Sequence, residues 1–273
     1  MAAPVASDPN SRPFEIASRT DPGLVREANE DHCATFCDGP CVGLVVADGV
    51  SGLEGGDTAS RLAVQVTRDS FLEQAASTSP AKRLFRAAQL ANIAVHDLAM
   101  VVPELRGMAT TLTAVVLVHD ELCAVHIGDC RLYLYRDGRL VQLSKDHTVA
   151  AERARLGLLS KTRARAHPGR SVLTRGLGRE LIARFDQISR RILERDLFVL
   201  CSDGIHGLLD DHEIAHLCAC GSAETLCAAL IQSANERGSP DNVTAAVARV
   251  TSTPTPASSG RGLLGILPRI LGR

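Results

Sequence analysis

Four aspartates that each stand beside a small residue at the end of an apolar run are the best candidates for chemistry in this chain. They are Asp31, Asp48, Asp203 and Asp241. A carboxylate that follows a buried strand is poorly solvated and costly to leave unpaired, so four of them indicate that a cation neutralises the group. No His-x3-His or Cys-x2-Cys spacing lies nearby, and oxygen-only ligands favour Mg2+ or Mn2+ over zinc. We therefore predict a site for a hard divalent metal.

The aspartates belong to a series of eight short motifs. In chain order these are Arg26-x2-Asn29-Glu30-Asp31, Asp48-Gly49, Gly107-Met108-Ala109-Thr110-Thr111-Leu112, Gly128-Asp129-Cys130-Arg131, Asp146-His147, Leu173-Thr174-Arg175-Gly176-Leu177-Gly178, Ser202-Asp203-Gly204 and Asp241-Asn242-Val243-Thr244. The series resembles the metal-dependent (type 2C, or PPM) serine/threonine protein phosphatases, and it is most similar to their compact bacterial members. A single Asp-Gly pair usually marks a turn, whereas eight motifs in the family's order, from about residue 18 to residue 250, are specific.

The resemblance implies a reaction and a binuclear metal centre. It predicts hydrolysis of phosphoserine and phosphothreonine on proteins by water that Mn2+ or Mg2+ activates. Two metals about 3.5–4 Å apart lower the pKa of a bridging water and clamp the phosphoryl oxygens. By resemblance, Asp48 bridges both ions, Asp203 and Asp241 hold one of them, and the Gly49 carbonyl helps to hold the other. The predicted catalytic residues are Asp31, Asp48, Asp203 and Asp241.

Three residues near the start of the motif series receive roles from the same resemblance. Glu30 and Asp31 match an acidic pair that acts through bound waters or by orienting them, and such carboxylates set the basicity of the waters. Arg26 matches an arginine that binds the substrate phosphate, because a planar guanidinium pairs bidentately with phosphate oxygens.

The motif around Asp129 leaves two interpretations open. By resemblance, Asp129 binds a third and weaker metal together with Asp203, so the expected cofactors are two or three ions. A turn, or a structural bond between Asp129 and Arg131, is the alternative. Thr110 and Thr111 are predicted to be structural, with packing and backbone hydrogen bonds as their roles.

The chain departs from the family's pattern in three places. Val50 stands where many eukaryotic relatives have a histidine that is proposed as the general acid, so water or another group must protonate the leaving alkoxide. The loop continues Ser51-Gly52-Leu53-Glu54, where bacterial relatives more often show Gly-Gly-His, and this change could alter substrate access. Cys130 replaces a more common serine.

Composition excludes several other classes of function. The chain of 273 residues has 30 Lys and Arg against 31 Asp and Glu, and 3% aromatic residues without Trp. There is no general basic field and there are few stacking platforms, which argues against nucleic acid. No apolar run approaches the roughly 20 residues of a membrane span. Nine cysteines without a secretory signal indicate free thiols, and we expect a cytoplasmic protein.

The apolar runs predict an α+β fold. An Asp137-Gly138 pair between two of the runs predicts a tight hairpin. Two long helices after the first strands, then more strands and two more helices, argue against a parallel sheet. The resemblance implies a β-sandwich of two mainly antiparallel sheets with helices on both outer faces. Strands are expected at residues 42–47, 112–118, 122–127, 132–135, 140–143 and 197–201, and helices at 57–74, 81–100, 211–219 and 223–236.

Three regions are predicted along the chain. Residues 1–13 form an N-terminal extension, residues 14–250 the phosphatase catalytic domain, and residues 251–273 a linker and tail. Polar and basic residues 148–170 interrupt the strands, where the family has a mobile flap beside the active site; a helix and loop without function is the alternative. The apolar and basic end of the tail is either disordered or a weak membrane or partner contact.

The expected partners are phosphorylated proteins and a cognate Ser/Thr kinase or its substrates, and the protein is expected to be a monomer. Two other functions compete with the protein phosphatase. One is a catalytically weak phosphoprotein-binding regulatory module on the same fold, against which the retained carboxylates argue. The other is a phosphohydrolase for nucleotides or small molecules.

Overall fold

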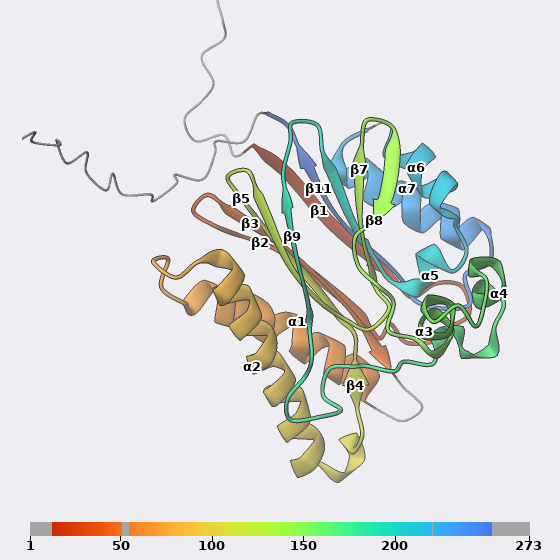
Figure 1. The fold of residues 1–273 in the computed structure, drawn as a ribbon. Helices are drawn as coiled ribbons and strands as arrows, with labels where there is room; N and C mark the ends of the chain where they lie inside the picture. Colours follow the sequence, from red (N-terminus) through yellow and green to blue (C-terminus); the bar gives the residue numbers. More distant parts are fainter. Residues whose placement is uncertain (1–12, 51–54, 220, 253–273) are drawn as a thin grey trace, which may run out of the picture.

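The computed structural model describes residues 13–50, 55–219 and 221–252, and two antiparallel sheets face each other in it (Figure 1). The first sheet has the strand order β1-β11-β10-β7-β8. Its strands are β1 (Phe14–Asp21), β11 (Val243–Val250), β10 (Leu197–Cys201), β7 (Arg131–Arg136) and β8 (Arg139–Gln142). The second sheet has the order β2-β3-β5-β6-β9, and the short β4 pairs with β3. Its strands are β2 (Asp31–Asp38), β3 (Cys41–Val50), β4 (Ala109–Thr110), β5 (Leu112–Val118), β6 (Glu121–Ile127) and β9 (Asp186–Arg191).

Helices cover the outer face of each sheet, as expected (Figure 1). Helices α1 (Gly56–Glu73) and α2 (Pro80–Val101) pack on the second sheet. Helices α6 (Asp211–Cys218) and α7 (Ala223–Glu236) pack on the first. The predicted α+β sandwich is therefore confirmed. None of the helices in the described part of the chain combines the length and apolarity that a bilayer crossing requires.

Strand β3 shows why the sandwich forms from this sequence. Val42, Leu44 and Val46 point into the core between the two sheets, while Val45 and Ala47 pack against the helices on the outer face. Both faces are buried, so the strand is a continuous apolar run rather than an alternating one. Burial of each such valine or leucine stabilises the fold by about 1.5–3 kcal/mol.

The hairpin between β7 and β8 confirms the turn prediction. Asp137 and Gly138 both have positive φ, of 50° and 77°. Positive φ at both central residues defines the type I′ turn, whose twist matches that of the flanking strands.

Residues 148–170 form a helical segment that lies, in the chain, between β8 of the first sheet and β9 of the second. It contains α3 (Val149–Arg155), α4 (Lys161–Arg165) and the start of a 3-10 turn, η2 (Pro168–Ser171). The hydroxyl of Thr148 caps α3 by accepting a hydrogen bond from the Ala151 N–H at 3.2 Å. We call residues 148–172 the basic excursion, because they contain five arginines and one lysine but a single acidic residue, Glu152.

Five strands are missing from the sequence-based strand set. They are β1, β2, β4, β9 and β11. The edge strand β9 has the sequence DQISRR and pairs only with β6 among the described residues. A polar edge strand has no apolar run to reveal it, because only one neighbour and one partly covered face support it.

Candidate metal and phosphate site

The four predicted aspartates lie at one end of the sandwich, although two of them do not follow a strand. Asp31 is the first residue of β2, and Asp241 precedes β11, so the expectation that all four follow buried strands is wrong for these two. Asp48 lies near the end of β3, and Asp203 directly follows β10 as the first residue of α5 (Asp203–His206). Strand starts and strand ends meet at the same edge of an antiparallel sheet, which explains the grouping.

Register places the first two aspartates opposite each other. Asp31 on β2 pairs with Asp48 on β3 as the last pair of their ladder. Facing like charges on neighbouring strands are destabilising unless something neutralises them. The charges of Asp203 and Asp241 also act on both residues.

Burial and mutual repulsion raise the pKa values of these carboxyls. The pKa of Asp31 rises from 3.8 to about 7, first because of burial and then because of the charges of Asp203 and Asp241. Burial and the charge of Asp241 raise the pKa of Asp203 to about 6. The pKa values of Asp48 and Asp129 lie well above the ordinary range for the same two reasons. A cluster of carboxyls that resists ionisation is one that a cation would stabilise.

One carboxylate oxygen of Asp31 accepts no hydrogen bond from the described residues. Asp31 is 2% exposed, and its buried Oδ2 atom has no hydrogen-bond partner among the residues that the structure describes. An orphaned buried carboxylate oxygen is strongly destabilising by itself, and it is a common sign of a missing ion or water.

The donor set fits Mn2+ or Mg2+. Within the described ranges, no three or more His, Cys, Asp or Glu side chains are placed so that they could hold a metal ion by themselves. Mg2+ keeps several waters and takes only one or two carboxylates, so a closed cage is not required for such an ion. The residues that would hold the ions are the carboxylates of Asp48, Asp203 and Asp241, with the waters oriented by Asp31.

Replacing Asp31 with asparagine tests this electrostatic account. A raised folded pKa, here from 3.8 to about 7, gives a contribution to stability that is fully present at low pH and is lost as pH rises through about 7. The neutral variant avoids this loss. We compare the free energies of unfolding of the two proteins in chelator. The value for the variant minus that for the wild type should increase by about 2 kcal/mol between roughly pH 5.5 and pH 8.

Urea unfolding of both metal-free proteins at both pH values measures this difference. Histidines that titrate in the same range are common to the two proteins, so their contribution cancels. An advantage that is equal at both pH values would show that Asp31 ionises normally in the folded protein.

Two threonines hold the backbone of Asp48. The Thr110 hydroxyl donates to the Asp48 carbonyl at 2.7 Å, and the Thr111 N–H donates to the same oxygen at 2.8 Å. The Asp48 N–H donates to the Thr111 hydroxyl at 2.9 Å. The structural role predicted for Thr110 and Thr111 is confirmed, and it fixes the backbone of Asp48 independently of its side chain.

Gly49 lies where only a glycine fits. A Cβ at this position would lie 2.3 Å from the backbone oxygen of Gly56, at the start of α1. The Gly49 N–H donates to the Glu30 carbonyl at 3.0 Å, which also accepts from the Ser60 hydroxyl at 2.5 Å. These contacts bring the Glu30–Asp31 segment against the end of β3.

Asn242 ties the Arg26–Asp31 segment to the start of β11. Its Oδ1 accepts from the Glu30 N–H at 2.8 Å, and its Nδ2 donates to the carbonyls of Pro22 and Ala28, each at 2.9 Å. Sequence reasoning assigned no role to this residue, because its partners are more than 200 positions away. Its place in a motif next to Asp241 was the available signal.

Arg26 lies beside the carboxylate cluster and forms an ion pair with one of its members, Asp241. Its Nη2 donates to Asp241 Oδ2 at 3.0 Å, and the side chains are 48% and 39% exposed. An ion pair this exposed contributes little to stability and is easily exchanged. Arg26 is therefore within reach of the carboxylate end of the sandwich and accessible to a ligand.

Asp129 is 6% exposed and does not make the structural bond to Arg131 that sequence reasoning left open. Arg131 instead donates from Nε and Nη2 to Asp146, at 3.0 and 2.7 Å, and from Nη1 to the Tyr133 hydroxyl at 2.9 Å. The guanidinium is thus occupied elsewhere. Burial and then the charge of Asp203 raise the pKa of Asp129, so these two carboxyls lie in the same electrostatic environment.

The departures from the family pattern have different outcomes. Val50 ends β3 and pairs with Ala109, so it offers no proton donor. Residues 51–54 lie outside the described part of the chain. The Cys130 thiol is 3.1 Å from the Thr111 hydroxyl, and burial raises its pKa well above the ordinary value. Cys130 is therefore an uncharged hydrogen-bonding neighbour of Thr111 and not a nucleophile.

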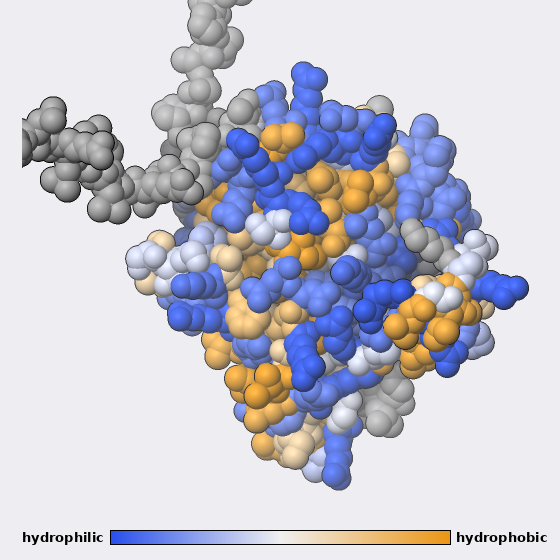
Figure 2. Space-filling model, viewed as in Figure 1, coloured by the Kyte–Doolittle hydropathy of each residue, from blue (hydrophilic) through white to orange (hydrophobic). Residues whose placement is uncertain are grey.

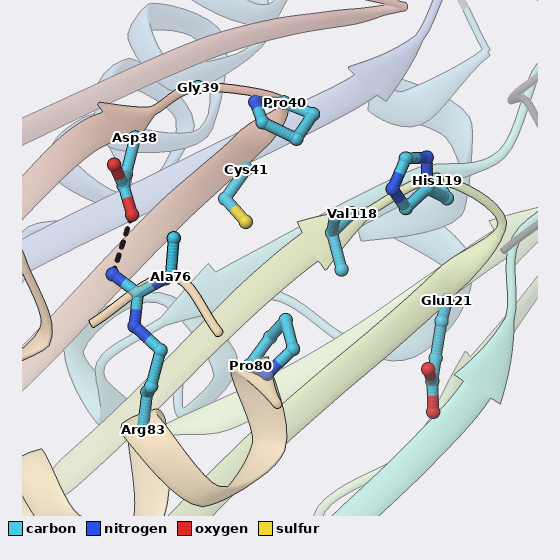
Figure 3. A pocket seen from close by; sticks show the side chains of 10 residues that line it. All are labelled: Asp38, Gly39, Pro40, Cys41, Ala76, Pro80, Arg83, Val118, His119 and Glu121. Atoms are coloured by element: carbon cyan, nitrogen blue, oxygen red, sulfur yellow. Dashed lines mark hydrogen bonds and ion pairs between the residues drawn. The ribbon is translucent and has the colours of Figure 1, made fainter. Parts of the chain in front are cut away.

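The site lies far from a cavity of about 300 Å3 at the other end of the sandwich (Figure 3). That cavity lies between the turn that precedes Cys41, the loop before Pro80 and the turn after Val118. From Cys41 to Asp48, β3 spans about 23 Å. The Arg83 guanidinium in the cavity wall pairs with Asp38 at 2.5 Å, so its charge is already compensated.

Comparison with known proteins agrees with this geometry. The family model described as "Protein phosphatase 2C" matches residues 25–247. The chain belongs to the protein phosphatase 2C family. The match includes every aspartate of the site, so the expected family is confirmed.

Named relatives of this phosphatase 2C chain come from several bacteria. It is 35% identical over 238 residues to the serine/threonine protein phosphatase PstP of Mycobacterium tuberculosis, and this match covers 87% of the chain but only 45% of PstP. The chain thus spans about half the length of that relative. It is 32% identical to the serine/threonine phosphatase stp of Listeria welshimeri, with 83% of the chain and 92% of the relative covered.

Solved structures share the fold. The crystal structure of PstP from M. tuberculosis matches with a TM-score of 0.80 and 32% identity, and covers 88% of this chain and 99% of that one. A structure of the PstP catalytic domain in complex with two manganese ions matches with a TM-score of 0.78 and 31% identity, over 88% and 99% of the two chains.

Proposed function

We propose that this chain hydrolyses phosphoserine and phosphothreonine on proteins with a binuclear Mn2+ or Mg2+ centre at the aspartate cluster. The observation that carries the proposal is the buried, unpartnered Asp31 Oδ2 among carboxyls with raised pKa values, in a chain of the phosphatase 2C family. A solved relative that holds two manganese ions supports the choice of metal.

Each residue of the site has a task in this reaction. Asp48 would contribute to holding both ions, Asp203 and Asp241 would hold one, and the Gly49 carbonyl would help to hold the other. Glu30 and Asp31 orient the waters that complete the coordination. When bound, the ions supply an activated water and neutralise charge on the phosphoryl oxygens. A third ion at Asp129 and Asp203 would act near the leaving group.

Arg26 binds the substrate phosphate in this proposal. Its guanidinium pairs with Asp241 at 3.0 Å, and a cation at Asp241 would release it for a phosphate. The planar fork of a guanidinium suits a dianionic monoester. The exposure of Arg26 allows this exchange without a change in the fold.

The basic excursion offers a surface for the protein part of the substrate. The positive charge of Arg170 acts on Asp203 together with that of Arg26, so the excursion borders the site. Leu156 and Leu158 are exposed at the end of α3, and Figure 2 shows an apolar patch over this region, with hydrophilic side chains around it. Such a surface can contact the protein part of a phosphoprotein.

Manganese-dependent release of phosphate from a phosphothreonine peptide tests the proposal. Turnover that depends on Mn2+ and greatly exceeds turnover of nucleoside monophosphates is the expected result. Binding of the peptide without turnover would favour the regulatory module, and a preference for nucleotides would favour the small-molecule phosphohydrolase. We further propose that the enzyme is a cytoplasmic monomer that reverses a bacterial-type Ser/Thr kinase.

Removal of the C-terminal region tests the proposed domain boundary. Val250 ends β11, and the Thr251 N–H donates to the Pro13 carbonyl at 2.9 Å as the last backbone bond of that sheet. A protein that ends at residue 252 should keep phosphopeptide turnover within a few-fold of the full chain, because every site residue lies before it. A soluble, folded truncation that loses activity would move the boundary into the tail.

A further inference from the structure

Two histidines hold the loop that carries Asp129, one on each side of the aspartate. On one side the main-chain N–H of Gly128 donates to the His147 ring nitrogen Nδ1 at 3.0 Å. The main-chain N–H of His147 donates in turn to the Gly128 carbonyl at 2.8 Å. On the other side His206 Nε2 lies 3.0 Å from the Asp129 carbonyl. A carbonyl only accepts, so His206 carries its proton on Nε2 and donates it.

His206 connects two aspartates that are distant in the sequence. It is the last residue of α5, and Asp203 is the first residue of the same helix. Because α5 has only four residues, a hydrogen bond made by His206 also restrains the position of Asp203 relative to the bonded group. The bond from His206 to Asp129 therefore determines how the loop after β6 approaches Asp203.

The surroundings of His206 keep this contact in place. The imidazole lies near the ion pair of Arg131 and Asp146, which occupies the guanidinium that could otherwise reach Asp129. The adjoining Gly128 has φ of 107°, and a Cβ there would lie 2.5 Å from the Thr111 side chain. The Gly128 backbone thus lies close to Thr111 on one side of the loop, and His206 contacts the loop on the side of α5.

We propose that His206 is a positioning residue, which holds Asp129 beside Asp203 so that the pair binds a weak third Mn2+ or Mg2+. This inference rests on the proposed function, because it takes from it the ions and the role of Asp129. His206 does not touch the ion or the substrate. It acts only through the Asp129 backbone.

Three variants separate this role from a general structural one. His206→Leu removes the donor, and His206→Gln keeps an N–H donor at about the position of Nε2. Arg83→Leu is the control. Arg83 is also buried and donates from Nη2 to a main-chain carbonyl, that of Phe71 at 2.8 Å, but it lies at the other end of the sandwich.

Mn2+ titration by calorimetry and electron spin resonance counts the ions that each protein binds. We expect His206→Leu to weaken the weakest site about tenfold or more and to leave the two tight sites unchanged, since residues that orient metal ligands typically have effects of 10–100-fold. His206→Gln should recover most of this affinity. Arg83→Leu should lower the melting temperature without changing the weakest site.

Hydrogen exchange in the metal-free proteins gives a readout that does not depend on activity. Amides of residues 128–131 should exchange faster in His206→Leu than in the wild type, and near the wild-type rate in His206→Gln. If His206→Leu does not fold, His206→Asn replaces it, because the asparagine amide is too short to reach the Asp129 carbonyl.

Specific outcomes would overturn the inference. A wild type that binds three ions, together with a His206→Leu variant that binds the third equally well, refutes the positioning role and leaves the proposed function intact. Equal weakening in His206→Leu and His206→Gln would also refute it, because the donor would then not matter. A wild type without Mn2+-dependent turnover refutes the proposed function itself.

Discussion

Replacing Asp48 with asparagine is expected to lower the rate of phosphopeptide hydrolysis by roughly 10^3-fold or more, because the proposed bridge between the two ions loses its charge. Asparagine has nearly the same shape but is a poorer ligand for a hard cation. Kinetics at saturating Mn2+, with a parallel calorimetric count of bound ions, measures both consequences. The variant should bind fewer ions tightly than the wild type.

The fold should survive this substitution. Thr110 and Thr111 hold Asp48 through its main chain at 2.7–2.9 Å, so the side-chain change leaves these bonds in place. In chelator the variant should be at least as stable as the wild type, since burial and the neighbouring carboxyls disfavour a charge at Asp48.

A matched charge removal controls for net charge. Asp97→Asn, on α2, removes a carboxylate that is 63% exposed and lies outside the cluster, so it should leave turnover within a factor of two or so. If purified, metal-supplemented Asp48→Asn hydrolysed the phosphopeptide at a rate near that of the wild type, the proposed binuclear centre would be refuted.

Replacing Asp129 with alanine is expected to leave two Mn2+ bound per chain but to slow hydrolysis of a phosphothreonine peptide by roughly 10^2-fold or more. Asp48, Asp203 and Asp241 remain to hold the two tight ions. The third ion acts near the leaving group in the proposed reaction, and Val50 cannot supply a proton there. The loss should therefore be larger for the phosphothreonine peptide than for an activated aryl phosphate, whose leaving group needs no such help.

Stability separates this role of Asp129 from a structural one. Arg131 is paired with Asp146 and Tyr133, so alanine at position 129 breaks no ion pair to Arg131. The substitution also removes the repulsion between Asp129 and Asp203; together with burial, this repulsion raises the pKa of Asp129. The metal-free variant should melt at or above the wild-type temperature. Equal slowing of both substrates, loss of a tight site or a lower melting temperature would return Asp129 to a structural role.

The sequence by itself determined the family, the fold class and the aspartates. The apolar runs of β3, β5 and β10 are continuous because both faces of those strands are buried, and such runs can be read without coordinates. The Asp137-Gly138 turn is also local, since its positive φ values depend on the two residues themselves. The motifs are short and ordered, so they identify the family without knowledge of pairing.

Only the tertiary structure decided how these residues meet. Asp31 begins β2 and faces Asp48 because of strand register, and register depends on a whole ladder rather than on either residue. Three contacts join positions 15 to 212 residues apart in the chain: the ion pair of Arg131 with Asp146, the bond of Asn242 to Glu30, and the bond of His206 to Asp129. Such contacts form when packing brings distant backbones together, and no local periodicity or propensity encodes them.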